Sequence, residues 1–400
     1  MPSSTTESIF YALVTVELLL SLWSLIQGVL WLAMARRRAN QHSGFFTPRV
    51  ALLCPCKGAE PGLEENLFSL ALQDYPNFEI FFILASDHDD SRSTIDRVIA
   101  AGPARAHLVI AGLPKGCGEK VNNLRAAISE LDPAFEVLVF ADSDGRPGRQ
   151  WVTHLVAPLS DPRLGAATTF RWWLPIHDSF WSAFGAAWDA SIVTMLGDHN
   201  HNFCWGGGTA IRRTVFDQIK VRDYWDGAVS DDWALTRALR AAGRKIQFLP
   251  ECLVPTLRDA DAAGLLNFTN RQIIITRVYA GGIWFAGVFS HYLYCASLVC
   301  GAIVIVQAIS IGQLWLTFAL LIVLIMLLAG IKGTLRWLAV LDLLPAHKQK
   351  LQTYAWAWTL LAPLVPFLYA INFATSAFTR RIIWRGIRYH LTSASQTEIV

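Results

Sequence analysis

The stretch Glu136-Val-Leu-Val-Phe-Ala-Asp-Ser-Asp144 decides the fold class of this chain. Its run of apolar and β-branched residues predicts a buried strand over residues 136–141. Two carboxylates with one residue between them, at the end of a strand, can offer oxygens to a hard divalent cation that also binds phosphates. Turns also collect aspartate, because its side chain bonds the local backbone. The stretch therefore predicts a strand with either a metal site or an ordinary turn at its end.

Short apolar runs like this one recur on both sides of it. Residues 49–265 alternate such runs with helical patterns, which predicts an α/β domain with a mainly parallel sheet and crossover helices. Open α/β sheets bind ligands at the carboxyl ends of their strands. The acidic turn Asp87-His-Asp-Asp90 follows one predicted strand, and Asp142-Ser-Asp144 follows another. We expect strands at 50–54, 79–84, 107–111, 136–141 and 164–170, and helices at 63–73, 91–101, 119–131 and 150–159.

The composition excludes several classes of protein. Of the 400 residues, 53% are hydrophobic and only 16% are Asp, Glu, Lys or Arg, whereas soluble domains carry about 25% charged residues. Intrinsic disorder, collagen and coiled coil are therefore excluded, and a net charge of +3 is too small to indicate nucleic-acid binding. The seven cysteines form no Cys-x-x-Cys pair, so neither a zinc site nor a disulfide framework is indicated. The glycine-rich motifs of dinucleotide and P-loop sites are absent from the sequence.

The first apolar run predicts a membrane anchor. Residues 9–35 are long enough to cross about 30 Å of hydrocarbon. A cleaved signal peptide is disfavoured, because residues 1–8 carry no basic residue and the run greatly exceeds the usual apolar core of such a peptide. The triple arginine at 36–38 follows directly. By the positive-inside rule, it predicts that the downstream residues face the cytoplasm.

Three further apolar runs, at 286–309, 313–331 and 355–377, predict a C-terminal membrane region. Three crossings would place the tail outside, whereas its four arginines (380, 381, 385 and 388) favour a cytoplasmic tail. Pro363 and Pro366 interrupt the last run, which predicts a re-entrant or interfacial element instead of a clean span. The expected layout of this multi-pass membrane protein is an anchor at 1–38, an α/β domain at 45–265, an interfacial segment at 266–285, a membrane region at 286–378 and a cytoplasmic tail at 379–400.

Three further groups of residues allow both a structural and a functional interpretation. Asp231-Asp232 opens a helical pattern, so the pair is either a helix cap or the site of a base that deprotonates an acceptor hydroxyl. Lys120 also lies at a predicted helix start, as a solvated lysine or as a phosphate ligand. The glycines Gly206, Gly207 and Gly208 either form a flexible loop or let the backbone approach a ligand closely.

In chain order, these pieces resemble the inverting glycosyltransferases of families 2 and 21, in particular the ceramide glucosyltransferase-like branch. The resemblance extends over about residues 45–390, and the joint order of the motifs is more specific than any one of them. The matching segments are 54–67 (CPCKGAEPGLEENL), 73–82 (QDYPNFEIFF), 86–90 (SDHDD), 119–123 (EKVNN), 141–144 (ADSD), 206–213 (GGGTAIRR), 230–235 (SDDWAL) and 383–389 (IWRGIRY).

The resemblance implies a GT-A fold and a role for each matching residue. Asp87 would help to hold uridine, and Lys120 would lie near the donor. Asp142 and Asp144 would bind the donor diphosphate through Mn²⁺ or Mg²⁺. Asp232 would be the general base, in a pair whose first residue is Asp231 where the family has Glu. The acceptor side would be formed by Gly206, Gly207, Gly208, Asp231 and Arg271.

One element departs from the family pattern. The family usually carries Gln/Arg-x-x-Arg-Trp. Here Arg271 takes the first position in one frame, but Ile274-Ile275 then replaces Arg-Trp; a frame at Arg277-Val278 loses the first residue and the tryptophan instead. In processive polysaccharide synthases that tryptophan helps to hold the acceptor sugar, so its loss disfavours such an enzyme.

The resemblance predicts inverting, metal-dependent transfer of one hexose, glucose in the family, from a UDP-sugar to a lipid hydroxyl at the cytoplasmic face. Ceramide is the acceptor that the family suggests, but diacylglycerol, a hopanoid or a polyprenyl phosphate would fit the same arrangement. The alternatives are a processive polysaccharide synthase and a non-catalytic membrane protein that binds a nucleotide sugar. The retained candidate base, Asp232, disfavours the second alternative, because a binding protein needs no base.

Overall fold

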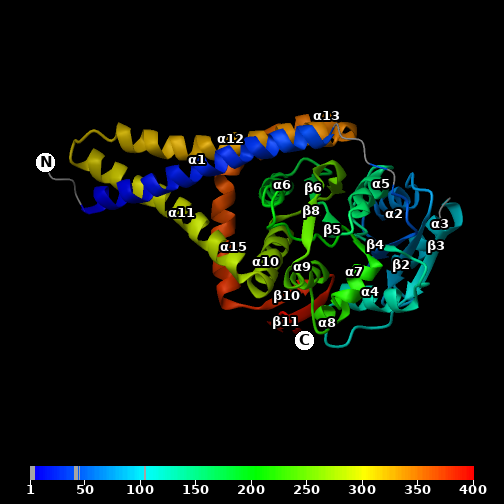
Figure 1. Ribbon diagram of the computed structural model, residues 1–400. Coiled ribbons are helices and arrows are strands. Elements are labelled where there is room, and N and C mark those ends of the chain that lie inside the picture. The colour runs from blue at the N-terminus through cyan, green and yellow to red at the C-terminus, as the bar shows by residue number, and fades with distance from the viewer. Residues whose placement is uncertain (1–4, 40–43, 45, 103–104) are drawn as a thin grey trace. The chain divides into compact units, whose positions relative to one another are not determined.

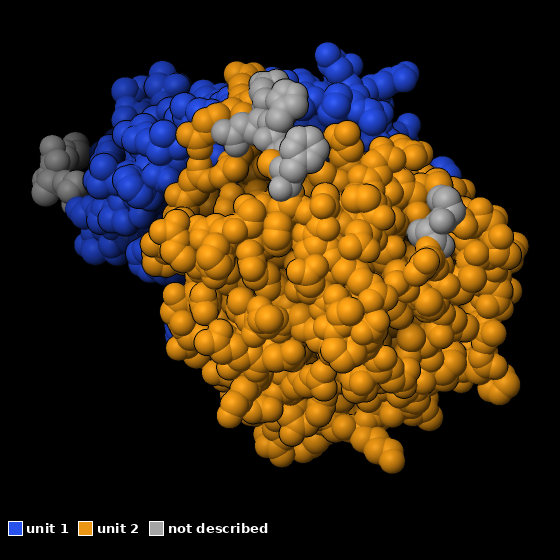
Figure 2. Space-filling view, turned by 45° about the vertical axis from the view of Figure 1, so that its right-hand side comes forward, with its two compact units in different colours: residues 1–34, 177–194, 260–379 blue, residues 35–176, 195–259, 380–400 orange. Residues whose placement is uncertain are grey.

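The computed structural model describes residues 5–39, 44, 46–102 and 105–400. The first four residues of the predicted anchor and the predicted domain boundary at residue 45 lie outside these ranges. The chain forms two compact units (Figure 2), each built from separate stretches of sequence. We call them the apolar unit (Met1–Met34, His177–Thr194 and Ala260–Thr379) and the α/β unit (Ala35–Ile176, Met195–Asp259 and Arg380–Val400).

In the described part of the α/β unit, seven strands form one mixed sheet in the order β3-β2-β1-β4-β7-β5-β8 (Figure 1). Neighbours in the β3-β2-β1-β4 half are parallel, and so are β5 and β8. Strand β7 is antiparallel to both β4 and β5. The strand pairs on either side of β7 are parallel, as predicted for a mainly parallel sheet. The strands are β1 (Val50–Pro55), β2 (Phe78–Leu84), β3 (Arg105–Ile110), β4 (Val137–Ala141), β5 (Leu164–Thr168), β7 (Gly208–Arg212) and β8 (Lys245–Phe248).

The first half of this sheet follows the sequence prediction closely. All five residues of β4 are buried, as expected for a continuous apolar strand that is covered on both faces. The expected helices also form, with three ending within two residues of the predicted position and the fourth continuing as a 3₁₀ turn at Ala157–Ser160. They are α2 (Leu63–Ala71), α3 (Arg92–Ala101), α4 (Glu119–Glu130) and α5 (Trp151–Val156).

The second half supplies elements that sequence analysis did not resolve. A separate parallel pair is formed by β6 (Arg171–Leu174) and β9 (Val254–Leu257). Helix α9 (Asp231–Ala241) begins at the predicted aspartate pair, and the Ser230 side chain accepts a hydrogen bond from the Trp233 N–H at its N-cap. Such a cap contributes about 1 kcal/mol to helix stability. Shorter helices are α7 (Arg213–Gln218), α8 (Val221–Trp225) and a 3₁₀ turn at Pro250–Cys252.

The predicted tail is a folded part of the α/β unit. Over residues 381–399 it forms an antiparallel sheet of β10 (Arg381–Trp384), β11 (Ile387–Ser393) and β12 (Gln396–Ile399). The Glu119 N–H at the start of α4 donates to the buried Tyr389 hydroxyl at 3.2 Å. A Cβ atom at Gly227 would collide with the Ser395 carbonyl oxygen, so the tail packs tightly on this unit.

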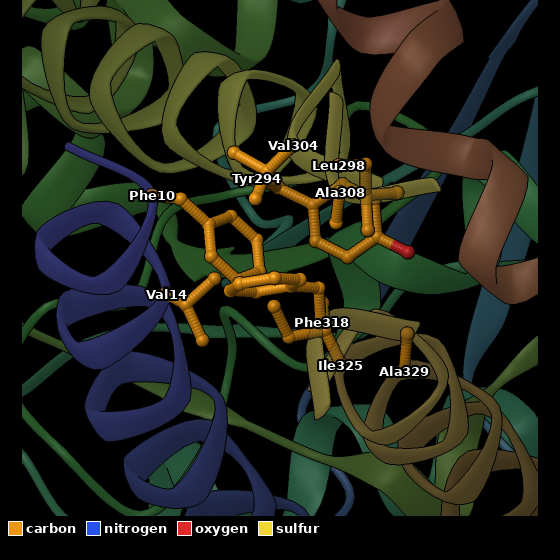
Figure 3. Packing of buried hydrophobic residues seen from close by; sticks show 9 residues of the cluster. All are labelled: Phe10, Val14, Tyr294, Leu298, Val304, Ala308, Phe318, Ile325 and Ala329. Carbon is orange, nitrogen blue, oxygen red and sulfur yellow. The ribbon is translucent and has the colours of Figure 1, made fainter. Parts of the chain in front are cut away.

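The apolar unit is helical. Helices α1, α11 and α12 pack through one buried cluster, in which Phe10 and Val14 contact residues of the other two helices (Figure 3). The opposite faces expose large apolar side chains such as Trp23 and Val306, as expected for surfaces that face lipid. Its helices are α1 (Thr5–Ala39, whose last turn belongs to the α/β unit), α6 (Phe180–Val193), α10 (Ala262–Tyr279), α11 (Gly281–Ser310), α12 (Leu316–Leu343), α13 (Lys348–Thr353), α14 (Ala355–Leu360) and α15 (Val365–Phe378), with 3₁₀ turns at Pro345–His347 and Ala362–Leu364.

Within the described residues, four helices are long and apolar enough to cross a membrane: Thr5–Ala39, Gly281–Ser310, Leu316–Leu343 and Ala355–Phe378. The predicted α/β domain with candidate transmembrane helices at both ends is confirmed.

The α/β unit constrains how many of these helices cross. The chain leaves this unit at Asp259 and returns to it at Arg380. Parts of one folded unit lie on one side of a membrane, so the chain between them makes an even number of crossings. Three candidate spans lie between these residues. We infer that Ala355–Phe378, interrupted by the 3₁₀ turn at Ala362–Leu364, does not cross fully.

This inference predicts the labelling of introduced cysteines. Cysteines at Ser395 and Asp161, both on the α/β unit, should react alike with a membrane-impermeant reagent in intact cells, and a cysteine at Leu314 should react oppositely. Leu314 is exposed and lies between α11 and α12, at the far end of one crossing. Mass spectrometry of labelled peptides would measure this, with permeabilised cells as the control for reactivity. Opposite labelling of Ser395 and Asp161 would contradict the inference.

Candidate active site

Three predicted residues from three elements meet around one ammonium group. The Lys120 Nζ, at the start of α4, lies 2.6 Å from Asp142 Oδ1, directly after β4. The same nitrogen lies 3.3 Å from Asp231 Oδ1, the first residue of α9. The start of α4 is fixed by Gly118, whose N–H donates to the Ala228 carbonyl at 2.9 Å. We call Lys120, Asp142, Asp231 and Asp232 the ion cluster.

Burial and charge set the protonation of this cluster. Burial raises the pKa of Asp231 most strongly; Lys120 lowers it, Asp232 and Asp142 raise it, and the result is about 7. Burial lowers the pKa of Lys120, but the charges of Asp142, Asp231 and Asp232 outweigh this effect and the pKa lies above its ordinary value. Lys120 is therefore a cation at neutral pH, and the pKa of Asp231 lies above that of an ordinary aspartate.

Asp232 has a different environment from its neighbour. Its Oδ1 accepts the Trp233 N–H at 2.7 Å and the Ser230 hydroxyl, and its Oδ2 accepts the Gly206 N–H at 3.2 Å. The Asp231 side chain is almost fully buried, whereas Asp232 is partly exposed. The carboxylate of Asp232 is thus fixed in orientation and still reachable from outside.

The glycine run passes against the ion cluster. A Cβ atom at Gly206 would lie 2.5 Å from Lys120 Nζ and 2.6 Å from Asp231 Oδ2, and one at Gly207 would lie 2.6 Å from Asp142 Oδ2. Gly208 is already the first residue of β7. The run is therefore a close backbone approach to the cluster and not a flexible loop.

We expect Gly206→Ala to lower activity by about 10-fold or more, because the added methyl group pushes Lys120 and Asp231 apart. The matched control is Gly148→Ala, because a Cβ atom at Gly148 meets nothing within 4 Å. Turnover and the thermal unfolding midpoint of both variants would be compared. Equal turnover of Gly206→Ala and Gly148→Ala would show that the tight packing at Gly206 is irrelevant to function.

Asp144, the second carboxylate after β4, lies in a different electrostatic setting. Burial and then the Asp142 charge raise its pKa, and the cations Arg385 and Arg171 oppose this effect.

Across residues 5–39, 44, 46–102 and 105–400, no group of three or more His, Cys, Asp or Glu side chains could hold a metal ion. Asp142 and Asp144, with one residue between them after β4, are the pair that the sequence predicts for a metal ion. Such a pair fits Mg²⁺ or Mn²⁺, since Mg²⁺ typically takes one or two carboxylates and completes its shell with phosphate and water oxygens.

Two predicted residues, Asp87 and Arg271, are not members of the ion cluster. Asp87, after β2, is exposed and forms an ion pair with Arg92. Arg271 lies on α10 of the apolar unit, where its guanidinium stands 5.5 Å from the centre of the Phe268 ring. The predicted roles of Asp87 and Arg271 remain predictions.

Sequence reasoning missed several residues that shape the site. Asp89 holds the acidic turn at residues 87–90 in place. Its Oδ1 accepts the Gly58 N–H at 2.8 Å and the Ser91 hydroxyl at 2.6 Å. These bonds join the loops after β1 and β2. The Asp-x-Ser spacing is a turn signature that could have indicated this role. Arg385, from the tail, pairs with Glu60 in the loop after β1. No local sequence pattern predicts that contact.

Comparisons with known proteins place the chain among glycosyltransferases. The sequence pattern described as Glycosyl transferase family 21 matches residues 16–397. Ceramide glucosyltransferase 1 from Caenorhabditis elegans is 22% identical over 233 residues, which are 56% of this chain and 48% of the worm protein. The match thus spans about half the length of that relative.

Two solved structures are also similar. A mannosyltransferase from Pyrobaculum calidifontis, in complex with GDP-Man and Mn²⁺, has a TM-score of 0.48 and 18% identity, covering 84% of this chain and 99% of that one. Glucosyl-3-phosphoglycerate synthase from Mycobacterium tuberculosis, with Mn²⁺, UDP-glucose and phosphoglyceric acid, has a TM-score of 0.40 and 15% identity, covering 60% and 86%.

Proposed function

The chain belongs to glycosyl transferase family 21, and on that basis we propose that it transfers one hexose, with inversion, from a UDP-sugar to the hydroxyl of a membrane lipid. Glucose is the proposed sugar and ceramide the proposed acceptor, as in the name of the worm relative. The observation that carries the proposal is the ion cluster. In it, Lys120 pairs with Asp142, directly after the end of β4, and with Asp231, at the start of α9.

The donor side is formed by Lys120, Asp142 and Asp144. Lys120 supplies a buried positive charge for a diphosphate, and its pairing with Asp142 fixes the position of that charge. A bound Mn²⁺ or Mg²⁺, held by Asp142 and Asp144, would neutralise negative charge on the leaving diphosphate. Asp87, in the turn after β2, is proposed to contact uridine.

The acceptor side is formed around Asp232. An acceptor hydroxyl has a pKa far above 7 and needs a positioned base. The N–H groups of Gly206 and Trp233 hold the Asp232 carboxylate in place. Asp232 takes the hydroxyl proton as the acceptor oxygen attacks the anomeric carbon, and the diphosphate leaves with the bonding electrons on the opposite side. Asp231 keeps Lys120 beside the reaction centre.

The apolar unit suits an acceptor that arrives from the bilayer, because its helices present apolar faces on which a lipid can move laterally. We propose that the α/β unit faces the cytoplasm, because the basic C-terminal end of α1 belongs to this unit. Arg37 and Arg38, at that end, pair with Asp198 of the same unit. Arg271 on α10 is proposed to lie on the acceptor side.

The test is an assay of the purified full chain with UDP-glucose and a membrane-lipid extract. We expect release of UDP together with a new glycolipid, one hexose heavier than its acceptor by mass spectrometry. UDP-glucose bound but unchanged would favour the non-catalytic alternative, and a lipid-free polymer would favour a polysaccharide synthase. The same assay with purified ceramide and diacylglycerol identifies the acceptor.

A further inference from the structure

Arg385 occupies an unusual backbone position in the tail. The register of β10 and β11 pairs Trp384 with Ile387 and leaves Arg385 and Gly386 as a two-residue turn. Both turn residues have positive φ, 50° at Arg385 and 79° at Gly386. Turns of this kind favour Asn-Gly, and a long side chain at positive φ is uncommon. The turn alone therefore gives no reason for an arginine at this position.

The side chain of Arg385 reaches toward the donor side of the site. Its guanidinium forms an ion pair with Glu60, in the loop after β1. Burial lowers the pKa of Arg385, but the charges of Glu60, Asp144 and Asp142 outweigh this effect and the pKa is raised. The carboxylates of Asp142 and Asp144, after β4, are thus among the charges that act on Arg385.

The hairpin that carries Arg385 is held firmly. Tyr389 on β11 is 2% exposed, and its hydroxyl accepts the Glu119 N–H, one residue before Lys120. Glu119 in turn accepts a bond from Lys57, which follows β1, at 2.7 Å. Hence β11, α4 and the loop after β1 are joined beside the two aspartates. This arrangement fixes the turn relative to the donor side.

We propose that Arg385 is a ligand of the donor's diphosphate, contributed to the active site by the tail. A guanidinium presents a planar fork of donors that matches two phosphate oxygens. Negative charge increases on the diphosphate as the sugar departs, and a fixed cation stabilises it. Before the donor binds, Glu60 keeps the guanidinium in place. This inference rests on the proposed function, because it assumes a nucleoside diphosphate donor.

Arg385→Asn separates this role from a structural one. Asn-Gly is a favoured pair for this turn, so the variant should unfold at the wild-type temperature or above. In the full chain, titrated with UDP in the presence of Mn²⁺, its dissociation constant should rise by about 10- to 100-fold, the effect of losing a charged hydrogen bond. The dissociation constant for UMP, which lacks the second phosphate, should rise less than about threefold. Arg388→Asn, an exposed position on the same hairpin, should leave both unchanged.

Each outcome bears on the proposal. Unchanged UDP affinity in Arg385→Asn, or equal losses for UDP and UMP, overturns it while the proposed function stands. A wild-type chain that binds no nucleoside diphosphate overturns both. If Arg385→Asn lowers the unfolding temperature, Arg385→Lys replaces it, keeping the charge without the fork. A selective loss of UDP affinity in the lysine variant supports the proposal, and wild-type affinity contradicts it.

Discussion

We expect Asp232→Asn to lower turnover by about 10²–10⁴-fold, whereas the affinity for UDP stays close to that of the wild type. The substitution removes the proposed proton acceptor but keeps the size of the side chain and an oxygen that can bond the Trp233 N–H. A structural role alone would therefore leave a folded and nearly active protein. Steady-state turnover of lipid acceptor and a UDP titration measure the two quantities separately.

Two neighbouring variants act as controls for this result. Ser230→Ala removes the hydroxyl that bonds Asp232 and the cap of α9, so it should cost about 1 kcal/mol of stability and much less activity. Asp231→Asn still offers an oxygen to Lys120 and should retain more turnover than Asp232→Asn. If Asp232→Asn instead keeps more than about a tenth of wild-type turnover while Asp231→Asn does not, the base is Asp231.

The second large effect is expected from loss of the divalent cation. Excess EDTA should abolish turnover, Mn²⁺ or Mg²⁺ should restore it, and Asp144→Ala should lower it at least about 100-fold. The physical reason is that Asp142 is already paired with Lys120. Without Asp144, the only remaining carboxylate of the predicted metal pair is one that already binds Lys120. Asp161→Ala, an exposed aspartate paired with Arg163, is the matched control. Full turnover in excess EDTA would refute a metal requirement.

The sequence predicted those parts of the fold in which the local pattern and the burial agree. The strand before Asp142 is a continuous apolar run, and β4 is buried at every position. The helix starts at Glu119 and Asp231 were also correct, because acidic residues in the first turn before apolar periodicity are typical of helix N-termini. Strand β7 escaped prediction, since its glycine-rich start has the composition of a loop.

The tail and the site contacts depend on tertiary structure. Strands β10 to β12 are short and carry several charges, so the sequence of the tail indicated only its position relative to the membrane. The pairing of Lys120 with both Asp142 and Asp231 joins residues that are 22 and 111 positions apart in the sequence. Spacing along the chain carries no information on such a contact, although each member was a candidate on its chemistry.

The tail sheet also has a consequence for the order in which the protein matures. The ribosome makes residues 35–176 and 195–259 of the α/β unit before the helices between Ala262 and Phe378, and only afterwards residues 380–400. Until the hairpin with Tyr389 arrives, the start of α4 lacks its hydroxyl partner and Glu60 lacks Arg385. The last strands of the unit can dock only after the intervening helices have been synthesised. A nascent chain whose membrane region is still being inserted therefore lacks part of the proposed donor side, and completion of that site follows completion of insertion.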